Sequence, residues 1–313
     1  MSSKKQKSQK KKKHPSDELI RTDRMPHIWC PGCGIGTVFG SVIHAIQNSA
    51  IPYDDMAVVS GIGCTGRMAG YIKLDSFHTT HGRAIAFATG LKLARPEGTV
   101  MVCSGDGDLL AIGGNHFIHA ARRNIDMTVV CVNNFNYGMT GGQLAPSTPF
   151  GAKTTTSPAG CPEMPFNFSQ MAYSCGAVYV SRWTSLHVRR LTESIEQALH
   201  KKGFSFVEIL SPCPTAFGRR NKIRRPLDLL RFFHQNSVIR NDIDPQEATL
   251  DFNQGLVVGN FVDIERPTFA DTCEVIESGE LQDWPNLYGK SAPEKQANSK
   301  NNKAETKDEK KAG

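Results

Sequence analysis

The sequence of 313 residues predicts an α/β fold built on a doubly wound parallel sheet. Short apolar runs alternate with longer segments of helical period, which is the pattern of repeated β–α units. The glycine-rich and polar motifs of the chain stand at or beyond the ends of the apolar runs, where open α/β sheets bind their ligands. With 39% hydrophobic residues, a chain of this length can bury one large core or two modest ones.

The predicted elements alternate regularly from residue 34 onward. In chain order they are a helix at 34–47, a strand at 56–60, a helix at 83–93, a strand at 99–104, a helix at 113–123, a strand at 127–132, a helix at 167–174, a strand at 177–180, a helix at 185–200 and a strand at 206–210. The strand runs are almost wholly apolar, as expected for strands that are buried on both faces. No internal repeat is visible.

The two ends of the chain differ from its centre in composition. Residues 1–14 carry seven lysines and no acidic residue, and residues 290–313 carry seven lysines and four acidic residues. The formal charge of +7 therefore belongs to the ends, and the part between them is slightly acidic. The expected organisation is a basic disordered tail at 1–18, an α/β domain at 19–225, a C-terminal extension packed on a partner at 226–289, and a disordered tail at 290–313.

Composition also narrows the class of protein. Lysine tails on an otherwise slightly acidic chain do not predict a nucleic-acid function. No run approaches the roughly 18 apolar residues that a membrane-spanning helix needs, and no signal-like segment stands near the N-terminus. Nine cysteines in such a chain favour a reducing cytoplasm over disulfide bonds.

The most informative motifs follow two neighbouring strands. A Gly-Asp-Gly sequence at 105–107 ends the first strand, and Asn134 ends the second, 28 positions after Asp106. Glycines let the backbone approach an anion closely, and a following helix aims its N-terminal amides at it. Asp106, the side-chain oxygen of Asn134 and a backbone carbonyl at Asn136 are hard ligands that suit Mg²⁺ shared with a diphosphate. Together they form the diphosphate–magnesium clamp of thiamine-diphosphate enzymes, although each half alone is an ordinary turn.

Four cysteines form a second pattern. Cys30 and Cys33 stand in the WCPGCG motif at 29–34, Cys64 in GIGCTG and Cys213 in SPCP. A CxxC loop rich in proline and glycine turns two thiolates toward one centre, and single cysteines on distant loops complete a set of four. Zinc ribbons usually show two CxxC pairs, so one pair and two singles favour an iron–sulfur cluster over zinc. A redox pair is the alternative for the CxxC alone.

Taken in order, the motifs WCPGCG, GIGC, FHTTHGRA, GDGD followed by IGGNH, NNFNYGMTGGQ and SPCPT resemble those of the β subunits of 2-oxoacid:ferredoxin oxidoreductases, most closely the 2-oxoglutarate type. The resemblance covers residues 28–215 densely. It implies a thiamine-diphosphate-binding fold of the pyrophosphate-domain type that carries thiamine diphosphate, Mg²⁺ and one 4Fe–4S cluster. The implied reaction converts 2-oxoglutarate and coenzyme A to succinyl-CoA, or the reverse, and exchanges electrons with ferredoxin through the cluster.

The resemblance also implies roles for single residues. It assigns the cluster to Cys30, Cys33, Cys64 and Cys213. It assigns the Mg²⁺ to Asp106, Asn134 and the backbone of Asn136. The residues expected to contact the cofactor are Gly63, Cys64, His81, Gly105, Gly107, Asp108, Asn136, Gly138, Met139 and Thr140.

Three side chains are candidates for catalysis. His78 and His81 flank a Thr-Thr pair in a loop that the resemblance puts against the cofactor, and a histidine there can transfer protons near neutral pH. A helix-start turn is the alternative for this pair. Arg67 can hold a substrate carboxylate with its guanidinium fork, or it forms an ordinary surface ion pair. Weaker candidates are His116 after the clamp and Gln143 near Thr140, the latter for diphosphate or coenzyme A.

Two parts of such an enzyme are missing from this sequence. Thiamine enzymes need a carboxylate against the aminopyrimidine ring, and the resemblance implies that a separate α subunit supplies it in an αβ or (αβ)₂ complex. The chain alone is therefore expected to be inactive. It also lacks the repeated CxxCxxC pattern of a two-cluster ferredoxin, so the electron acceptor is another protein. The basic run at 219–225 is either a docking surface for an acidic ferredoxin or a solvated linker.

Other functions stay open at this point. Pyruvate or a branched-chain 2-oxoacid would undergo the same chemistry as 2-oxoglutarate. A non-oxidative thiamine decarboxylase would share the clamp but need no cluster. A zinc-binding structural protein would explain the CxxC and the lysine tail, but not the clamp.

Overall fold

The computed structural model describes residues 14–252 and 255–279, so the tail predicted at 290–313 lies outside the described residues. The chain divides into two units, 1–272 and 273–313, and the first contains the whole sheet. Of the second unit only the segment 273–279 is described, which contains the end of a helix. No helix in the described ranges is long and apolar enough to cross a bilayer.

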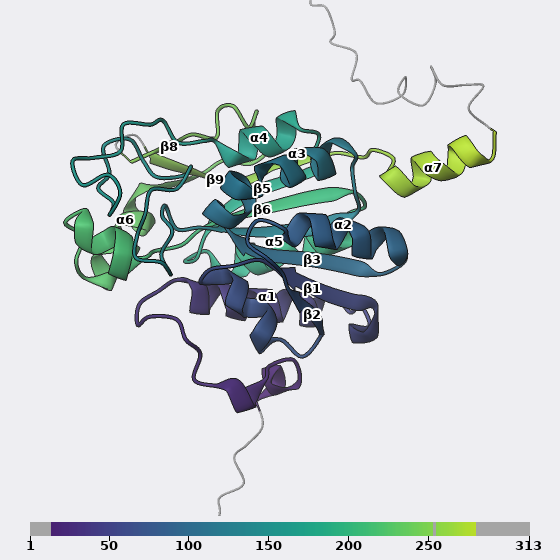
Figure 1. Cartoon of the computed structure of the whole chain (residues 1–313), viewed down its shortest axis with the longest axis horizontal. Coiled ribbons are helices and arrows are strands. Elements are labelled where there is room, and N and C mark those ends of the chain that lie inside the picture. The colour runs from purple at the N-terminus through teal and green to yellow at the C-terminus, as the bar shows by residue number, and fades with distance from the viewer. Residues whose placement is uncertain (1–13, 253–254, 280–313) are drawn as a thin grey trace, which may run out of the picture. The chain divides into compact units, whose positions relative to one another are not determined.

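Nine strands form one sheet, in the order β2–β1–β3–β4–β6–β5–β9–β7, with β8 paired to β9 (Figure 1). The strands are β1 (Met56–Ser60), β2 (Asp75–His78), β3 (Thr99–Gly105), β4 (Met127–Asn133), β5 (Tyr179–Thr184), β6 (Phe204–Leu210), β7 (Ser237–Ile239), β8 (Leu250–Asp251) and β9 (Gly255–Asp263). The pairs among β1 to β6 are all parallel, whereas β9 runs antiparallel to β5.

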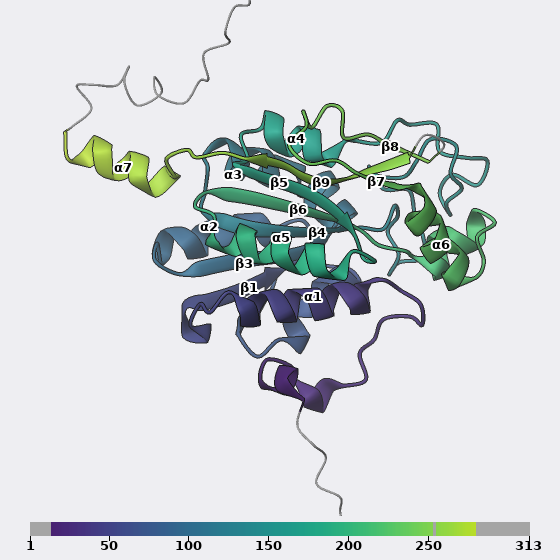
Figure 2. The ribbon, with the colours of Figure 1, turned by 180° about the vertical axis from the view of Figure 1, so that it is seen from behind.

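Helices cover both faces of the sheet. The helices are α1 (Ile35–Asn48), α2 (Ala84–Ala94), α3 (Gly114–Arg122), α4 (Phe168–Ser174), α5 (Val188–His200), α6 (Pro226–Asn236) and α7 (Phe269–Glu277). One apolar cluster joins α1 and α5 to one face, and a second joins α2, α3 and α4 to the other (Figures 1 and 2). Because β4 and β6 lie between these layers, every residue in them is buried. The doubly wound, mainly parallel sheet predicted from the sequence is confirmed.

Two differences from the predicted organisation concern the ends of the α/β domain. The C-terminal extension was expected to begin at residue 226, but β9 is hydrogen-bonded to β5 and continues the same sheet. At the other end, Pro15–Glu18 forms a helical turn within the predicted tail of 1–18, and Ser16 in that turn is buried. The turn at 15–18 is too short for a periodic pattern, and the apolar residues of β9 do not reveal that it pairs with β5.

The strand order creates a crevice between β1 and β3, at the carboxyl ends of the strands. From β1 the chain passes to β2 at the sheet edge, whereas from β3 it passes the other way, to β4. The loops that follow β1 and β3 therefore leave in opposite directions. Such a switch point is where open α/β sheets bind ligands, beyond the carboxyl ends of the strands.

Candidate active site and metal centre

A cavity of about 110 Å³ opens at this switch point. Its walls come from the loop after β1, the Gly-Asp-Gly turn after β3, the turn after β4, and His81 from the loop between β2 and α2. Every residue that the sequence assigns to the Mg²⁺ clamp or to cofactor contact lines it. We call it the clamp cavity. The sequence reasoning missed three further lining residues, which are Ile62, Thr65 and Tyr137.

The Gly-Asp-Gly turn lies closely against the turn after β4. A Cβ atom on Gly107 would stand 2.3 Å from Cε1 of Tyr137, so any larger residue would displace the Tyr137 ring. The Tyr137 hydroxyl also donates a hydrogen bond to the Gly107 carbonyl at 3.3 Å. After Gly105 the backbone enters a helical turn, which continues as the π-helical turn Asp108–Ile112. Helical irregularities of this kind are frequent at functional sites.

Asp108 joins the loops that converge on the switch point. Its Oδ1 accepts hydrogen bonds from the backbone N–H of Ile62 at 3.2 Å and of Gly82 at 2.8 Å. The Ser104 hydroxyl donates to Oδ2 at 2.5 Å, and the His81 ring donates to Oδ1. Protein groups thus occupy both oxygens of this carboxylate, so Asp108 holds the loops around the cavity and fixes the ring of His81.

Asp106 is the second buried carboxyl group of the clamp cavity. Burial raises its pKa to about 7, against the lowering effect of a hydrogen bond that the Ser147 hydroxyl donates to Oδ2. A carboxylate that is buried without a cation beside it carries such a desolvation cost. A divalent ion in the cavity would relieve the cost, so the group suits a metal ligand. Ser147 is 41 residues from Asp106 in the sequence and belongs to none of the motifs, so the sequence did not predict this contact.

The turn after β4 brings two asparagines to the same cavity. Asn134 and Asn136 are both buried, and the Asn136 side chain donates to the Asn134 carbonyl at 2.8 Å. Between them Phe135 has a φ of 65°, in the left-handed region that bulky residues rarely adopt. Thr148 donates to the Phe135 carbonyl at 2.7 Å and holds this conformation. Strained residues of this kind persist where the surroundings over-determine them, often at functional sites.

The four cysteines predicted to bind a cluster line one cavity of about 310 Å³, which we call the cysteine cavity. Cys30 is exposed and the other three are partly buried. The CxxC loop is joined to the other cysteine loops by two hydrogen bonds. Trp29 Nε1 donates to the Cys64 carbonyl at 2.7 Å, and the Gly34 N–H donates to the Pro212 carbonyl at 3.3 Å. The fold thus brings together four thiols from three distant segments.

The environment of these thiols suits a cationic metal group. Among the residues that the structure describes, no three His, Cys, Asp or Glu side chains stand close enough to hold one metal ion. Burial and the neighbouring cysteines raise the pKa of Cys33 to about 12 and that of Cys64 to about 11. Cationic iron would offset this cost of the thiolate form.

The two cavities share a wall. Cys64, Asn134, Gly138 and Met139 line both of them. In addition, Cys213 Sγ lies 3.9 Å from Oδ1 of Asn136, so the turn after β4 touches one of the four cysteines directly. A ligand in the clamp cavity and a cluster in the cysteine cavity would therefore be neighbours.

Several candidate residues lie outside both cavities. Arg67 is exposed, and His78 is exposed at the end of the edge strand β2. Burial lowers the pKa of His116, which belongs to α3. Gln143 exchanges two hydrogen bonds with Thr140, at 2.6 and 2.8 Å. None of these four residues lines the clamp cavity, whereas Thr140, the partner of Gln143, does.

Comparison with known proteins agrees with this geometry. Residues 61–209 match the family described as thiamine pyrophosphate enzyme, C-terminal TPP binding domain. The 2-oxoglutarate synthase subunit KorB of Methanocaldococcus jannaschii is 52% identical over 259 residues, which are 82% of this chain and 95% of that protein. The subunit of the same name from Methanothermobacter marburgensis is 49% identical, over 83% of this chain and 91% of that protein.

A solved structure is also similar. It is the 2-oxoglutarate:ferredoxin oxidoreductase from Magnetococcus marinus with 2-oxoglutarate, coenzyme A and succinyl-CoA bound. The TM-score is 0.76 at 30% sequence identity, and the similarity covers 89% of this chain and 96% of that chain.

Proposed function

The chain belongs to the family of β subunits of 2-oxoglutarate:ferredoxin oxidoreductases, and we propose that it holds the thiamine diphosphate, the Mg²⁺ and the single 4Fe–4S cluster of such an enzyme. In this proposal the enzyme converts 2-oxoglutarate and coenzyme A to succinyl-CoA and CO₂, or catalyses the reverse reaction, in the cytoplasm. Electrons are exchanged with ferredoxin through the cluster, and an α subunit completes the active site.

The observation that carries the proposal is the wall shared by the two cavities. Bound thiamine diphosphate supplies the nucleophilic carbon and stabilises the negative charge left when a 2-oxoacid loses CO₂. Asp106, Asn134 and the Asn136 carbonyl would hold its diphosphate through Mg²⁺. Because Asn136 also touches Cys213, this turn would separate the cofactor from a cluster held by the four cysteines. A non-oxidative decarboxylase has no use for such an adjacent cysteine site.

Exposed apolar side chains near the clamp cavity support an α subunit at this edge. Ile62 and Met139 line the cavity and are about half exposed, at 42% and 46%. Phe77 and Phe87 are also exposed, with ring centroids 4.8 Å apart, and Ile112 beside Gly82 is 51% exposed. Clustered apolar side chains mark protein interfaces. An α subunit bound there could place its carboxylate against the aminopyrimidine ring.

The direct test is a reaction with defined substrates. The chain is co-expressed anaerobically with its α subunit, and reduction of a viologen dye is measured with 2-oxoglutarate, pyruvate or 2-oxoisovalerate, each with and without coenzyme A. Coenzyme A-dependent reduction with 2-oxoglutarate alone is expected. Reduction with pyruvate or 2-oxoisovalerate would keep the mechanism and change the substrate. A colourless complex that contains zinc instead of iron would contradict the proposal.

Binding of Mg²⁺ is expected to depend on pH because Asp106 has a raised pKa of about 7. Below that pH the ion must displace a proton, so the affinity for Mg²⁺ with thiamine diphosphate should rise about tenfold between pH 6 and 8 and level off above. Isothermal titration calorimetry between about pH 6 and 8 measures this affinity.

The Ser147→Ala variant is the matched control for this pH dependence. It removes the hydroxyl that lowers the pKa of Asp106, so the same rise should move to higher pH. The phosphate of the cofactor titrates equally with both proteins, so their difference reports on Asp106. Identical profiles for the two proteins would contradict this role of Asp106.

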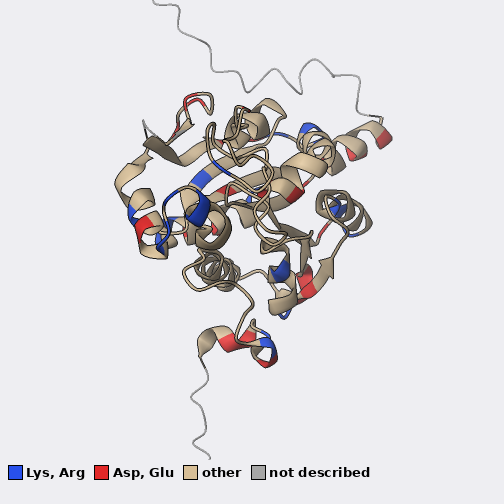
Figure 3. Ribbon diagram, turned by 60° about the vertical axis from the view of Figure 1, so that its left-hand side comes forward, with Lys and Arg blue, Asp and Glu red and all other residues tan. Residues whose placement is uncertain are grey.

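A basic surface lies beside the cysteine cavity. It consists of Lys153, Arg219, Arg220, Lys222 and Arg224, all exposed; lysines and arginines are blue in Figure 3. The side chain of Asn221 joins its two parts, because it accepts from the Lys153 N–H at 2.7 Å. None of the ion pairs among described residues involves these five cations, whereas the next one, Arg225, pairs with Asp228. We propose this surface as the docking site for an acidic ferredoxin.

Neutralising the basic surface should weaken the reaction with ferredoxin alone. The triple variant Arg219→Gln/Arg220→Gln/Arg224→Gln is expected to raise the KM for ferredoxin about tenfold at low salt, because opposite charges speed encounter. The effect should shrink at high salt, and viologen reduction should stay unchanged. The variant Arg122→Gln/Arg123→Gln, at the amino-terminal edge of the sheet, is the control and should match the wild type. Equal losses with ferredoxin and viologen would contradict docking.

A further inference from the structure

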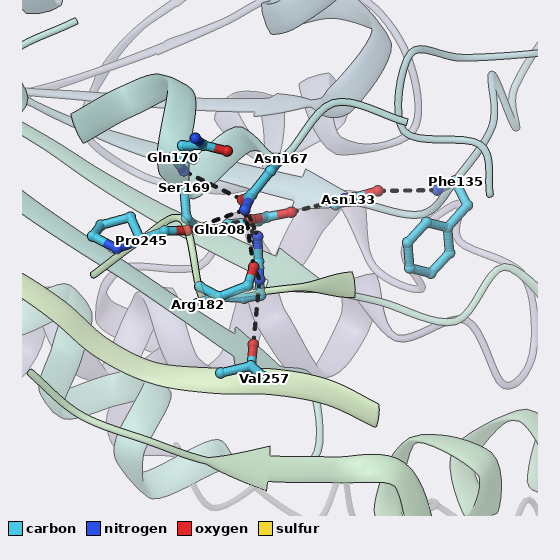
Figure 4. A network of polar contacts seen from close by, with 10 residues as sticks. Asn133, Phe135, Asn167, Ser169, Gln170, Arg182, Glu208, Pro245 and Val257 are labelled. Carbon is cyan, nitrogen blue, oxygen red and sulfur yellow. Dashed lines mark hydrogen bonds and ion pairs between the residues drawn. The ribbon is translucent and has the colours of Figure 1, made fainter. Parts of the chain in front are cut away.

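A buried polar network lies beneath the turn after β4 (Figure 4). Arg182 of β5 and Glu208 of β6 are partners in the sheet register, and both side chains are fully buried. Arg182 Nε donates to Glu208 Oε2 at 2.7 Å. Taking two charges out of water is costly, and apolar residues in place of such a pair often leave stability unchanged or higher. A contribution to stability is thus a weak explanation for this pair.

The remaining contacts hold the carboxylate of Glu208 in one orientation. Ser169 donates to the same Oε2 at 3.1 Å. The guanidinium of Arg182 is itself fixed, because it donates to the Ala248 carbonyl at 2.7 Å and to Asn167 Oδ1 at 3.0 Å. With Oε2 held from two sides, the direction of the other oxygen, Oε1, is also determined.

One side chain, that of Asn133, connects Oε1 of Glu208 to the turn that lines the clamp cavity. Asn133, the last residue of β4, donates from Nδ2 to Oε1 at 2.8 Å. The Oδ1 of the same amide accepts from the backbone N–H of Phe135 at 3.2 Å. Asn133 therefore links the buried ion pair to the strained residue between Asn134 and Asn136. Without this acceptor, the left-handed conformation of Phe135 would lose one of the contacts that hold it.

We propose that Glu208 and Asn133 are positioning residues for the Mg²⁺–diphosphate site. The fixed carboxylate orients the Asn133 amide, and the amide holds the turn in the shape that brings Asn134 and Asn136 to the cavity. Groups that orient metal ligands in this way tune affinity without touching the metal. The inference rests on the proposed function, because it concerns the binding of that cofactor.

An exchange of donor and acceptor tests the link. Asn133→Asp keeps an acceptor for Phe135 but sets a second carboxylate against Glu208. The double variant Asn133→Asp/Glu208→Gln restores the hydrogen bond with donor and acceptor exchanged. In the αβ complex, freed of cofactor, the apparent Kd for thiamine diphosphate at saturating Mg²⁺ is measured by fluorescence quenching. The single variant is expected to bind about 10–100-fold more weakly, and the double variant to recover most of the loss.

Ser194→Ala is the matched control, because it removes buried hydrogen bonds to Tyr179 and Ser181 that involve neither Glu208 nor Asn133. Its Tm should fall, whereas its cofactor affinity should stay close to that of the wild type. The proposal is overturned if Asn133→Asp binds like the wild type, if the double variant binds no better than the single one, or if Ser194→Ala weakens binding equally.

A replacement variant and the binding of the wild-type complex complete the test. If Asn133→Asp does not fold, judged by its Tm and iron content, Asn133→Ser replaces it and should also bind the cofactor more weakly. A wild-type complex that binds no thiamine diphosphate would overturn the proposed function, and this inference with it. Tight binding by the wild type and by every variant would overturn this inference alone.

Discussion

Replacing Cys33 by alanine is expected to remove the iron–sulfur cluster and to abolish viologen reduction. Cys33 lines the cysteine cavity together with Cys30, Cys64 and Cys213, and it is the member whose thiol has its pKa raised to about 12 by burial and by the other three. Because Cys33 is partly buried, water cannot easily take its place as a ligand of the cluster. Changes to groups that merely orient a ligand cost 10–100-fold, so loss of the ligand should cost more than about 100-fold in activity.

The same experiment separates the two cavities. In the Cys33→Ala complex, iron content and brown colour should be lost, whereas thiamine diphosphate should still bind, because Cys33 does not line the clamp cavity. Cys175→Ala is the control, since Cys175 lies at the end of α4 and lines neither cavity. A Cys33→Ala complex that retains full iron content would show that the four cysteines do not hold the cluster.

Replacing Asp106 by asparagine is expected to weaken cofactor binding and to leave the cluster in place, the reverse of the Cys33→Ala result. The variant should lose Mg²⁺-dependent binding of thiamine diphosphate by more than about 100-fold, because the amide keeps the shape of the carboxylate but not its charge. The cluster should remain, since Asp106 does not line the cysteine cavity. Cofactor affinity and iron content, measured on the same sample, decide between these outcomes.

Stability gives this variant a second readout. The raised pKa of about 7 means that the folded, cofactor-free chain holds the Asp106 proton more tightly than the unfolded chain, whose ordinary value is 3.8. Stability of the cofactor-free protein should therefore fall by a few kcal/mol as pH rises from about 4 through 7. Asp106→Asn should lack this part of the fall. Asp126→Asn, at a carboxylate paired with Lys92 away from the site, should retain both the fall and cofactor binding. Loss of cofactor binding in that control would contradict the assignment.

The sequence predicted the alternating core of the fold because its strands are continuous apolar runs. The strand expected at 56–60 coincides with β1, and the helix expected at 167–174 is α4 with Asn167 as its N-cap. The edge strand β2 was missed because all four of its residues are exposed, so no apolar run marks it. β9 has apolar runs at 256–258 and 261–262, which the prediction overlooked, but its place beside β5 depends on pairing with a distant segment. Periodicity reports burial, so it fails for an exposed strand, and it does not tell which strands pair.

By itself, the sequence determined which side chains line the clamp cavity and the cysteine cavity. Residues that follow parallel strands reach the same end of the sheet, so Asp106, Asn134, Cys64 and Cys213 could be grouped. Cys30 and Cys33 precede the first strand, and the CxxC spacing and the resemblance added them to the group. Only the tertiary structure decided how they are held. Asp108 joins loops, Ser147 reaches Asp106 across 41 residues, and Asn133 rests on Glu208 across 75 residues. The physical reason is that a hydrogen bond between distant segments depends on how they pack, and packing leaves no period or spacing in the chain.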